Sequence, residues 1–224
     1  MSATVGYGVI LTGVTGMVGE GVLLECLDDP AIARVLVVAR RPTGRTNAKL
    51  SELLVASFLD LGGVEDKLTG YDACFYCAGV SSVGMTEEEY TKVTYETPLH
   101  FAEVLARRNP TMVFCHISGA HTDGTEQGNV MWARVKGRAE NALMRLPFKA
   151  VYNFRPGFMR ATPGQRNLKW YYTAFGWTYP ILRAFFPDHV STLRGVARAM
   201  IRAAREGAPK QVLEVPDMNA LGGV

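Results

Sequence analysis

The stretch Val9-Ile10-Leu11-Thr12-Gly13-Val14-Thr15-Gly16-Met17-Val18-Gly19 decides the fold. It is an apolar run that breaks into three glycines and continues as Glu20-Gly21-Val22-Leu23-Leu24-Glu25-Cys26-Leu27. β-Branched residues in the run before the first glycine predict a buried strand. Apolar residues then recur at helical spacing, as in Val18, Val22 and Cys26, so the second half predicts a helix.

The three glycines predict the turn between this strand and this helix. Gly13 lets the chain reverse, Gly16 lets the backbone approach a pyrophosphate at the helix N-terminus, and Gly19 lets the helix lie close on the sheet. The turn therefore predicts a dinucleotide site, although its GxxGxxG spacing departs from the GxGxxG fingerprint. The alternative is a glycine-rich turn without a ligand, which the flanking strand and helix disfavour.

Arginines follow the next predicted strand, Arg34 to Ala39, which completes a β-α-β unit. Proteins that prefer NAD carry an acidic residue at the end of this strand, where this chain has Arg40 and Arg41, with Arg45 shortly after. Because guanidinium groups bind the 2′-phosphate and a carboxylate would repel it, we expect NADP(H). The alternative is that these arginines only solvate a loop.

The later elements extend the same alternation of strands and helices. We expect a third strand at Leu53 to Ser57, with the adenine end of the cofactor near Phe58 to Asp60. A capping box at Thr86 to Glu89 starts a long helix that ends at Arg108 and is kinked at Pro98. The remaining strands are expected at residues 71–77, 112–118, 148–154 and 212–215, and the remaining helices at 129–146 and 192–205.

The length of the chain predicts a single domain. Its 224 residues are enough for one substantial α/β domain with a sizeable core, and no linker, repeat or low-complexity tract interrupts them. We therefore expect one domain over residues 1–224, with a small substrate or lid lobe within about 158–190.

Charge and hydropathy limit the expected partners and location. The net charge of +3 is spread along the chain, so we expect a small-molecule substrate and neither nucleic acid nor a membrane as partner. Because Met1 to Thr12 leads directly into the first strand without a secretion signal, we expect a cytoplasmic protein. A homodimer is left open.

Cys74 and Cys77 form a CxxC pair, a spacing that also occurs in metal and redox sites. They fall within a predicted strand, where an offset of three places them on opposite faces. We therefore expect buried small hydrophobic residues and no metal site.

The chain resembles the atypical short-chain dehydrogenases/reductases, the NAD(P)-binding epimerase/dehydratase-like group, and is especially similar to the small subgroup that includes the Tat-interacting oxidoreductase-like proteins. The resemblance covers nearly the whole chain. It is carried by Thr12 to Gly19, Ala39-Arg40-Arg41, Cys77-Ala78-Gly79, Val135-Lys136-Gly137 with Glu140, and Phe154-Arg155-Pro156-Gly157.

This resemblance implies the fold and the cofactor site. The implied fold is α/β, a three-layer doubly wound parallel sheet of the NAD(P)-binding Rossmann type, with the cofactor at the carboxyl edge. The implied cofactor-binding residues are Gly13, Thr15, Gly16, Met17, Val18, Arg40, Arg41, Ala78, Gly79, Lys136, Pro156 and Gly157. Arg155 is expected to be structural.

The catalytic residues depart from the family pattern. The family places a tyrosine four residues before the lysine, but here Trp132 precedes Lys136, and an indole cannot serve as a general acid or base. Lys136 can still bind the nicotinamide ribose, and Ser118 matches the serine that hydrogen-bonds the substrate carbonyl. Our candidate proton donor is His121; water, Tyr171 or a His121 without a role remain alternatives.

Two functions are compatible with these residues. The first is an NADP(H)-dependent oxidoreductase or epimerase-like enzyme that acts on a small carbonyl or hydroxyl compound with an altered proton relay. The second is a cofactor-binding sensor or interaction protein with little or no catalysis. The aromatic stretch from Trp170 to Phe186 is core, a lid over an apolar substrate, or a dimer surface.

Overall fold

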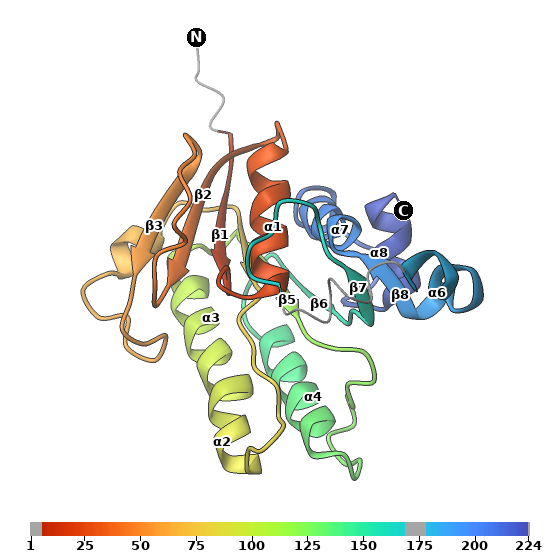
Figure 1. The fold of residues 1–224 in the computed structure, drawn as a ribbon. Helices are drawn as coiled ribbons and strands as arrows, with labels where there is room; N and C mark the ends of the chain where they lie inside the picture. Colours follow the sequence, from red (N-terminus) through yellow and green to blue (C-terminus); the bar gives the residue numbers. More distant parts are fainter. Residues whose placement is uncertain (1–5, 169–177, 224) are drawn as a thin grey trace.

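The computed structural model describes residues 6–168 and 178–223. These residues form a seven-stranded, fully parallel sheet in the order β3-β2-β1-β4-β5-β6-β9 (Figure 1). The strands are β1 (Tyr7–Thr12), β2 (Ile32–Ala39), β3 (Leu50–Leu54), β4 (Ala73–Tyr76), β5 (Val113–Ile117), β6 (Ala150–Phe154) and β9 (Val212–Leu213). The winding reverses between β1 and β4, and doubly wound sheets bind ligands at the carboxyl end of such a switch point.

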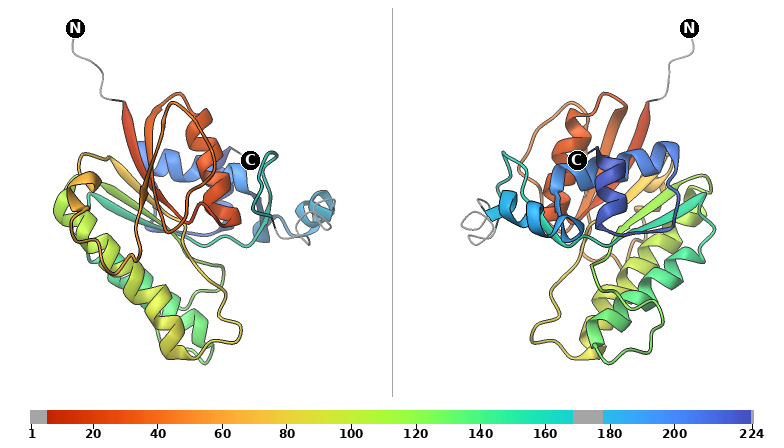
Figure 2. Two further views of the ribbon diagram at one scale, coloured as in Figure 1. Left: turned by 60° about the vertical axis from the view of Figure 1, so that its left-hand side comes forward. Right: turned by 90° about the vertical axis from the view of Figure 1, so that its right-hand side faces the viewer.

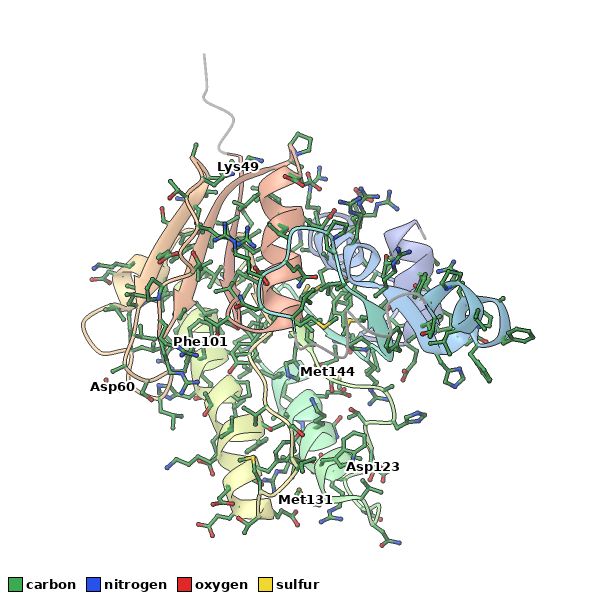
Figure 3. The ribbon with its side chains drawn as sticks, viewed as in Figure 1. Lys49, Asp60, Phe101, Asp123, Met131 and Met144 are labelled. Atoms are coloured by element: carbon green, nitrogen blue, oxygen red, sulfur yellow. The ribbon has the colours of Figure 1, made fainter. Side chains whose placement is uncertain are left out.

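Helices cover both faces of the sheet (Figures 1 and 2). One face carries α1 (Met17–Asp28), α7 (Leu193–Glu206) and α8 (Val215–Gly222), and the other carries α3 (Thr97–Arg108) and α4 (Met131–Met144). The short α2 (Glu87–Thr91) extends the line of α3 beyond the sheet (Figure 1). The ends of α4, Met131 and Met144, are labelled in Figure 3. The expected three-layer doubly wound α/β fold is confirmed.

Alternating side chains along the strands build two cores. Val9 and Leu11 of β1 pack in the cluster that contains Val22 of α1. Ile10 points to the opposite face and packs in the cluster that contains Phe101 of α3. Since successive residues of a strand point to opposite faces, an almost uninterrupted apolar run suits a strand that is buried on both sides.

The prediction for the third strand was wrong by three residues. β3 spans Leu50–Leu54, not Leu53 to Ser57, because Leu54 pairs with Ala39, the last residue of β2. Beyond it only the Val55 N–H still bonds to the Ala39 carbonyl, at 3.0 Å. β3 is an edge strand that exposes Ser51 and Glu52, so its apolar residues do not mark its extent.

The helix that begins at Thr86 is not a single α-helix. The predicted capping box is present, with the Thr86 N–H donating to Glu89 Oε2 at 2.8 Å. A π-helical turn, Lys92–Glu96, separates α2 from α3. It ends two residues before Pro98, which has no N–H to donate to the carbonyl four residues back. The Thr97 hydroxyl donates to the Lys92 carbonyl at 2.7 Å. The expected irregularity at Pro98 is thus a π-helical turn.

A smaller group of elements lies within residues 158–192. β7 (Phe158–Arg160) pairs in parallel with β8 (Val190–Thr192), and α6 (Tyr179–Phe185) stands at the periphery (Figure 2). Residues 169–177 of the aromatic stretch, which include Tyr171, lie outside the described residues. Within the described part of the chain, no helix combines the length and apolar character needed to cross a bilayer.

Candidate functional site

A cleft of about 430 Å³ opens at the carboxyl ends of β1, β2 and β4. It coincides with the switch point of the sheet. Its lining includes the expected cofactor residues Gly13, Thr15, Gly16, Arg40, Arg41, Ala78 and Gly79. Met17, Val18, Lys136, Pro156 and Gly157 are not among the residues that line it.

Two glycines of the turn are required by the fold itself. Gly13 has a φ of 72°, and a Cβ there would lie 2.4 Å from the Cys77 carbonyl carbon. A Cβ on Gly19 would lie 2.3 Å from the Gly13 oxygen. The turn can therefore lie against the end of β4, and α1 can lie against the turn, only without side chains.

Gly16 differs, because the protein itself leaves room for a side chain there. A Cβ on Gly16 would meet only the Gly13 oxygen, at an ordinary 3.4 Å, and one on Gly79 would meet nothing within 4 Å. Gly16 is the N-cap of α1, and because it has no side chain, no side-chain hydrogen bond caps this end of the helix. The open space beside the start of α1 fits a diphosphate, which favours backbone N–H donors and the positive end of a helix dipole.

The three arginines after β2 have different environments. Arg40 and Arg41 are exposed at the cleft, and neither pairs with an acidic side chain of the described residues. Arg45 instead forms an ion pair with Glu20 and donates to the Gly164 carbonyl at 3.0 Å. The cleft therefore has two guanidinium groups available for an anion, Arg40 and Arg41.

The loop after β3 closes the other side of the cleft. Phe58 lines it, and its ring meets Phe101 edge-on at 5.3 Å between centroids. The expected position of the adenine end, Phe58 to Asp60, thus falls partly at the cleft, where Asp60 is not a lining residue. Sequence reasoning missed Tyr76, Val93 and Thr97. Val93 reaches the cleft from the π-helical turn and Thr97 from the start of α3. The spacing of apolar residues did not predict that this part of the helix faces the cleft.

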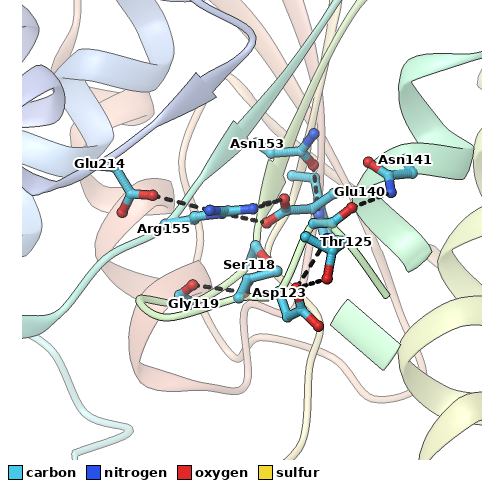
Figure 4. Close-up of polar contacts among 12 residues, drawn as sticks. Ser118, Gly119, Asp123, Thr125, Glu140, Asn141, Asn153, Arg155 and Glu214 are labelled. Carbon is cyan, nitrogen blue, oxygen red and sulfur yellow. Dashed lines mark hydrogen bonds and ion pairs between the residues drawn. The ribbon is translucent and has the colours of Figure 1, made fainter. Parts of the chain in front are cut away.

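Ser118 begins a short chain of hydroxyl groups after β5 (Figure 4). Its Oγ lies 3.1 Å from Thr122 Oγ1, and Thr122 donates to the Gly119 carbonyl at 2.7 Å. Since Thr122 has one hydroxyl proton, Ser118 is the donor to Thr122, and its own lone pairs remain free to accept. Thr122 was not predicted; it follows Ser118 by four residues through a turn.

Lys136 extends from α4 toward this same strand end. A Cβ on Gly119 would lie 3.9 Å from Nζ of Lys136. Burial lowers the pKa of the Lys136 ammonium, and the Glu140 carboxylate opposes that shift. Trp132 lies one helical turn earlier on α4. The structure thus brings Lys136 close to the Ser118–Gly119 backbone.

His121 lies away from the cofactor cleft. It is exposed and has a φ of 63°, in the left-handed region that non-glycine residues seldom adopt. It lines a second cavity of about 700 Å³ at the ends of β5 and β6. The other lining residues are Ala120, Gly157, Phe158, Leu182, Phe186, Asp188, His189, Val190, Glu214 and Val215.

Pro156 and Gly157 help to shape the second cavity. The Pro156 carbonyl accepts a hydrogen bond from Ala120 N–H at 3.1 Å, which ties the loop after β6 to the loop after β5. A Cβ on Gly157 would lie 2.3 Å from the His189 oxygen. These two expected cofactor-binding residues therefore hold loops together.

Arg155 connects α4 to the last strand (Figure 4). It forms an ion pair with Glu140 at 2.6 Å and with Glu214 at 3.1 Å. The Glu140 contact is bidentate, through Nε and Nη2. Two carboxylates satisfy this guanidinium, in accord with the structural role expected for it.

A second polar pair lies beneath α4. The His116 ring is buried, and its Nδ1 lies 3.0 Å from Asn153 Oδ1. Burial, together with the nearby charge of Lys136, lowers the pKa of His116 to about 4, although the hydrogen bond that the ring donates to Asn153 Oδ1 opposes this shift. His116 is therefore neutral at pH 7 and does not supply a proton there.

The cysteines are free thiols. Cys74 packs in the α3 core and Cys77 against the α1 core, as their offset in the strand predicted. Burial raises the pKa of both thiols. Over residues 6–168 and 178–223, His, Cys, Asp and Glu nowhere gather in a group of three able to hold a metal.

Comparison with known proteins gives three kinds of similarity. The model of the NAD dependent epimerase/dehydratase family matches residues 9–134. The proteins named "Protein fmp52, mitochondrial" of Emericella nidulans and Aspergillus fumigatus are 29% and 30% identical, each over 71% of this chain and 68% of their own length. "Leucinostatins biosynthesis cluster protein T" of Purpureocillium lilacinum is 29% identical over 62% of this chain and about half of its own length, 51%.

Solved structures show the same fold at low identity. "MoeE5 in complex with UDP-glucuronic acid and NAD" has a TM-score of 0.66 at 17% identity, covering 97% of this chain and 83% of that one. The Bordetella bronchiseptica enzyme WbmG in complex with NAD has a TM-score of 0.68 at 13% identity, covering 99% and 79%.

The relatives overturn one expectation. The cytoplasmic location expected from the sequence is wrong, because the fmp52 relatives are named as mitochondrial proteins. The inference rested on the absence of a secretion signal, and such a signal bears on export, not on the choice between cytoplasm and mitochondrion.

Proposed function

The chain belongs to the NAD dependent epimerase/dehydratase family, and from this membership we propose that it is an oxidoreductase or epimerase-like enzyme that binds NADP(H) and acts on a small carbonyl or hydroxyl compound. The observation that carries the proposal is the cleft at the switch point, where Gly16 leaves room beside the start of α1 and two free arginines face the same space. The first N–H groups of a helix have no partner within it, and together with unpaired guanidinium groups they suit the two phosphate regions of one ligand.

The preference for NADP(H) rests on Arg40 and Arg41. They follow β2, the strand whose end faces the adenosine ribose in this fold, and a planar guanidinium binds a phosphate through paired hydrogen bonds. The neighbouring structures that hold NAD are 13% to 17% identical to this chain, so their cofactor is not transferred to it.

When bound, the coenzyme would supply or accept hydride, and the chain would hold the reactants and manage the proton. Lys136 would bind the ribose hydroxyls next to the nicotinamide, because that task needs only a positioned ammonium. Ser118 would face the substrate oxygen, and its hydroxyl would turn from Thr122 to donate to a carbonyl there. Trp132 cannot exchange a proton, since an indole only donates a hydrogen bond. His121 is the proposed proton donor, on the second-cavity side of Ser118.

The second candidate is an NADP(H)-binding sensor or interaction protein with little or no catalysis. It is favoured by Trp132, which occupies the place where a phenol would be needed. General acid catalysis contributes roughly 10² to 10⁴ in rate, so its loss leaves a slow enzyme.

A turnover assay separates the two candidates. The wild-type protein and a Trp132→Tyr variant are assayed for NADPH oxidation with a panel of aldehydes and ketones. Wild-type turnover that falls on substitution of His121 by alanine supports the enzyme. NADPH binding without wild-type turnover, combined with activity gained by Trp132→Tyr, supports the sensor. A protein that binds no NADPH contradicts both.

A further inference from the structure

The second cavity adjoins the candidate reaction site. Ala120 and His121 line it and directly follow Ser118 and Gly119, beside which Lys136 lies. The Ser118 N–H bonds to the Phe154 carbonyl at 2.7 Å, so the loop is fixed to the end of β6. The cavity therefore opens at the same sheet edge as the cofactor cleft, and its lining begins one residue after Gly119, although Ser118 and Lys136 do not themselves line it.

Most of the cavity wall is apolar. Its apolar side chains come from separate elements: Phe158 of β7, Leu182 of α6, Phe186 after it, Val190 of β8 and Val215 of α8. The volume of about 700 Å³ falls within the range of small-molecule sites. Phe186 leaves 56% of its surface exposed, and an apolar ligand in the cavity would cover part of it.

The charged groups of the wall are acidic. Asp188 and Glu214 line the cavity, and neither lysine nor arginine is found among its described lining residues. Arg155 forms an ion pair with Glu214, but it also pairs with Glu140. Its positive charge is therefore already balanced and is not available to a ligand anion. A nucleotide-linked sugar carries a diphosphate, which needs cations or N–H donors and would here meet two carboxylates across apolar walls.

Among the described lining residues, the polar side chains other than these two carboxylates are the imidazoles of His121 and His189. His121 is held in the left-handed backbone region. Such strained non-glycine residues cluster at ligand-binding positions. A polar end at His121 and an apolar remainder match a molecule with a single carbonyl or hydroxyl group.

We infer that this second cavity is the substrate site of the proposed enzyme, and that it takes an uncharged carbonyl compound with an apolar body and rejects nucleotide-linked sugars. The inference rests on the proposed function for the reaction, but the cavity itself is tested by binding alone.

Calorimetric titration tests the inference with two probes, 4-phenyl-2-butanone and UDP-glucuronic acid, each with and without saturating NADP⁺. We expect the ketone to bind with a dissociation constant of about 1 mM or tighter and UDP-glucuronic acid to bind at least about tenfold more weakly. Leu182→Lys should weaken ketone binding about tenfold or more, because it places a charge in the apolar wall. Ile181→Lys is the matched control, because Ile181 is 53% exposed on the same helix and does not line the cavity. The affinity of this variant for the ketone should stay within about twofold of the wild-type value.

Three results would overturn the inference: no ketone binding, equal or tighter binding of UDP-glucuronic acid, or ketone binding that Leu182→Lys leaves unchanged. If Leu182→Lys fails to fold, Phe186→Lys introduces the same charge at an exposed ring of the wall. NADP⁺ is titrated separately, so a protein that binds the ketone but no NADP⁺ refutes the proposed function and not the nature of the cavity.

Discussion

Glu20 and Arg45 form an ion pair beside the cofactor cleft, with the Glu20 side chain only 2% exposed. The same carboxylate accepts hydrogen bonds from the backbone N–H groups of Arg166, at 2.9 Å, and Asn167, at 2.7 Å. Gln165 adds a hydrogen bond from its side chain to the Met17 carbonyl at 2.6 Å. Met17 and Glu20 of α1 thus hold residues 165–167 against the start of the helix that follows the glycine turn.

Replacing this carboxylate should destabilise the protein. Glu20→Gln leaves Arg45 without its carboxylate partner, and breaking a buried ion pair costs on the order of 3 kcal/mol. Glu65→Gln is the control, since its pair with Arg108 is half-exposed, at 30% and 39%, and such pairs contribute about 0 to 1 kcal/mol. Urea unfolding measures both changes; equal losses would contradict a special role for Glu20.

The cost of Glu20→Gln should depend on pH. Burial alone would raise the pKa of Glu20, but hydrogen bonds from Arg45, Asn167 and Arg166 outweigh it and hold the pKa below its usual value of 4.5. The folded protein therefore gains stability from the ionised carboxylate above pH 4.5 and loses it as the pH falls through the lower folded pKa. The stability difference between wild type and variant should shrink below pH 4.5, and a difference that grows there would contradict this.

His116 should make the protein sensitive to mild acid. Its folded pKa of about 4 lies below the ordinary 6.5, so the unfolded chain binds a proton that the folded chain refuses. Stability should therefore fall between pH 6.5 and 4, by up to about 3 kcal/mol. His116→Gln keeps an amide for Asn153 but cannot titrate, so its unfolding free energy should change less over this range. The same slope in both proteins would show that His116 is not the cause.

The glycines of the turn should separate folding from binding. Gly19→Ala puts a Cβ 2.3 Å from the Gly13 oxygen and should cost roughly 1 to 3 kcal/mol of stability. Gly16→Ala meets no close protein atom and should change stability by less than about 1 kcal/mol. It should nevertheless weaken dinucleotide binding about tenfold, because the backbone can no longer approach the diphosphate. A Gly16→Ala protein with unchanged affinity would show that the ligand lies elsewhere.

Local sequence patterns were enough to predict the central strand, the glycine turn and the first helix. The apolar run and glycines of Val9 to Gly19 predicted β1, the turn and α1, and the arginine pair after β2 was placed at the cleft. Local patterns did not predict the role of residues whose partners lie far away in the sequence. Arg45 resembled a phosphate ligand beside Arg40 and Arg41, but it pairs with Glu20.

The missed features have the same origin. β3 ends where its partner β2 ends, which no property of the third strand itself reveals. Thr122 reaches Ser118 through a turn, and the wall of the second cavity comes from elements up to 95 positions apart, from Ala120 to Val215. Such contacts depend on how the elements pack against one another, and this packing leaves no periodic pattern in the sequence.

The most direct measurement is a calorimetric titration of the wild-type protein with NADP⁺ and with NAD⁺, repeated on Arg40→Ala/Arg41→Ala. The account predicts that NADP⁺ binds at least about tenfold more tightly than NAD⁺, and that the double variant loses this preference while its affinity for NAD⁺ changes by less than about threefold. Equal wild-type affinity for the two coenzymes, or no heat with either, would contradict it.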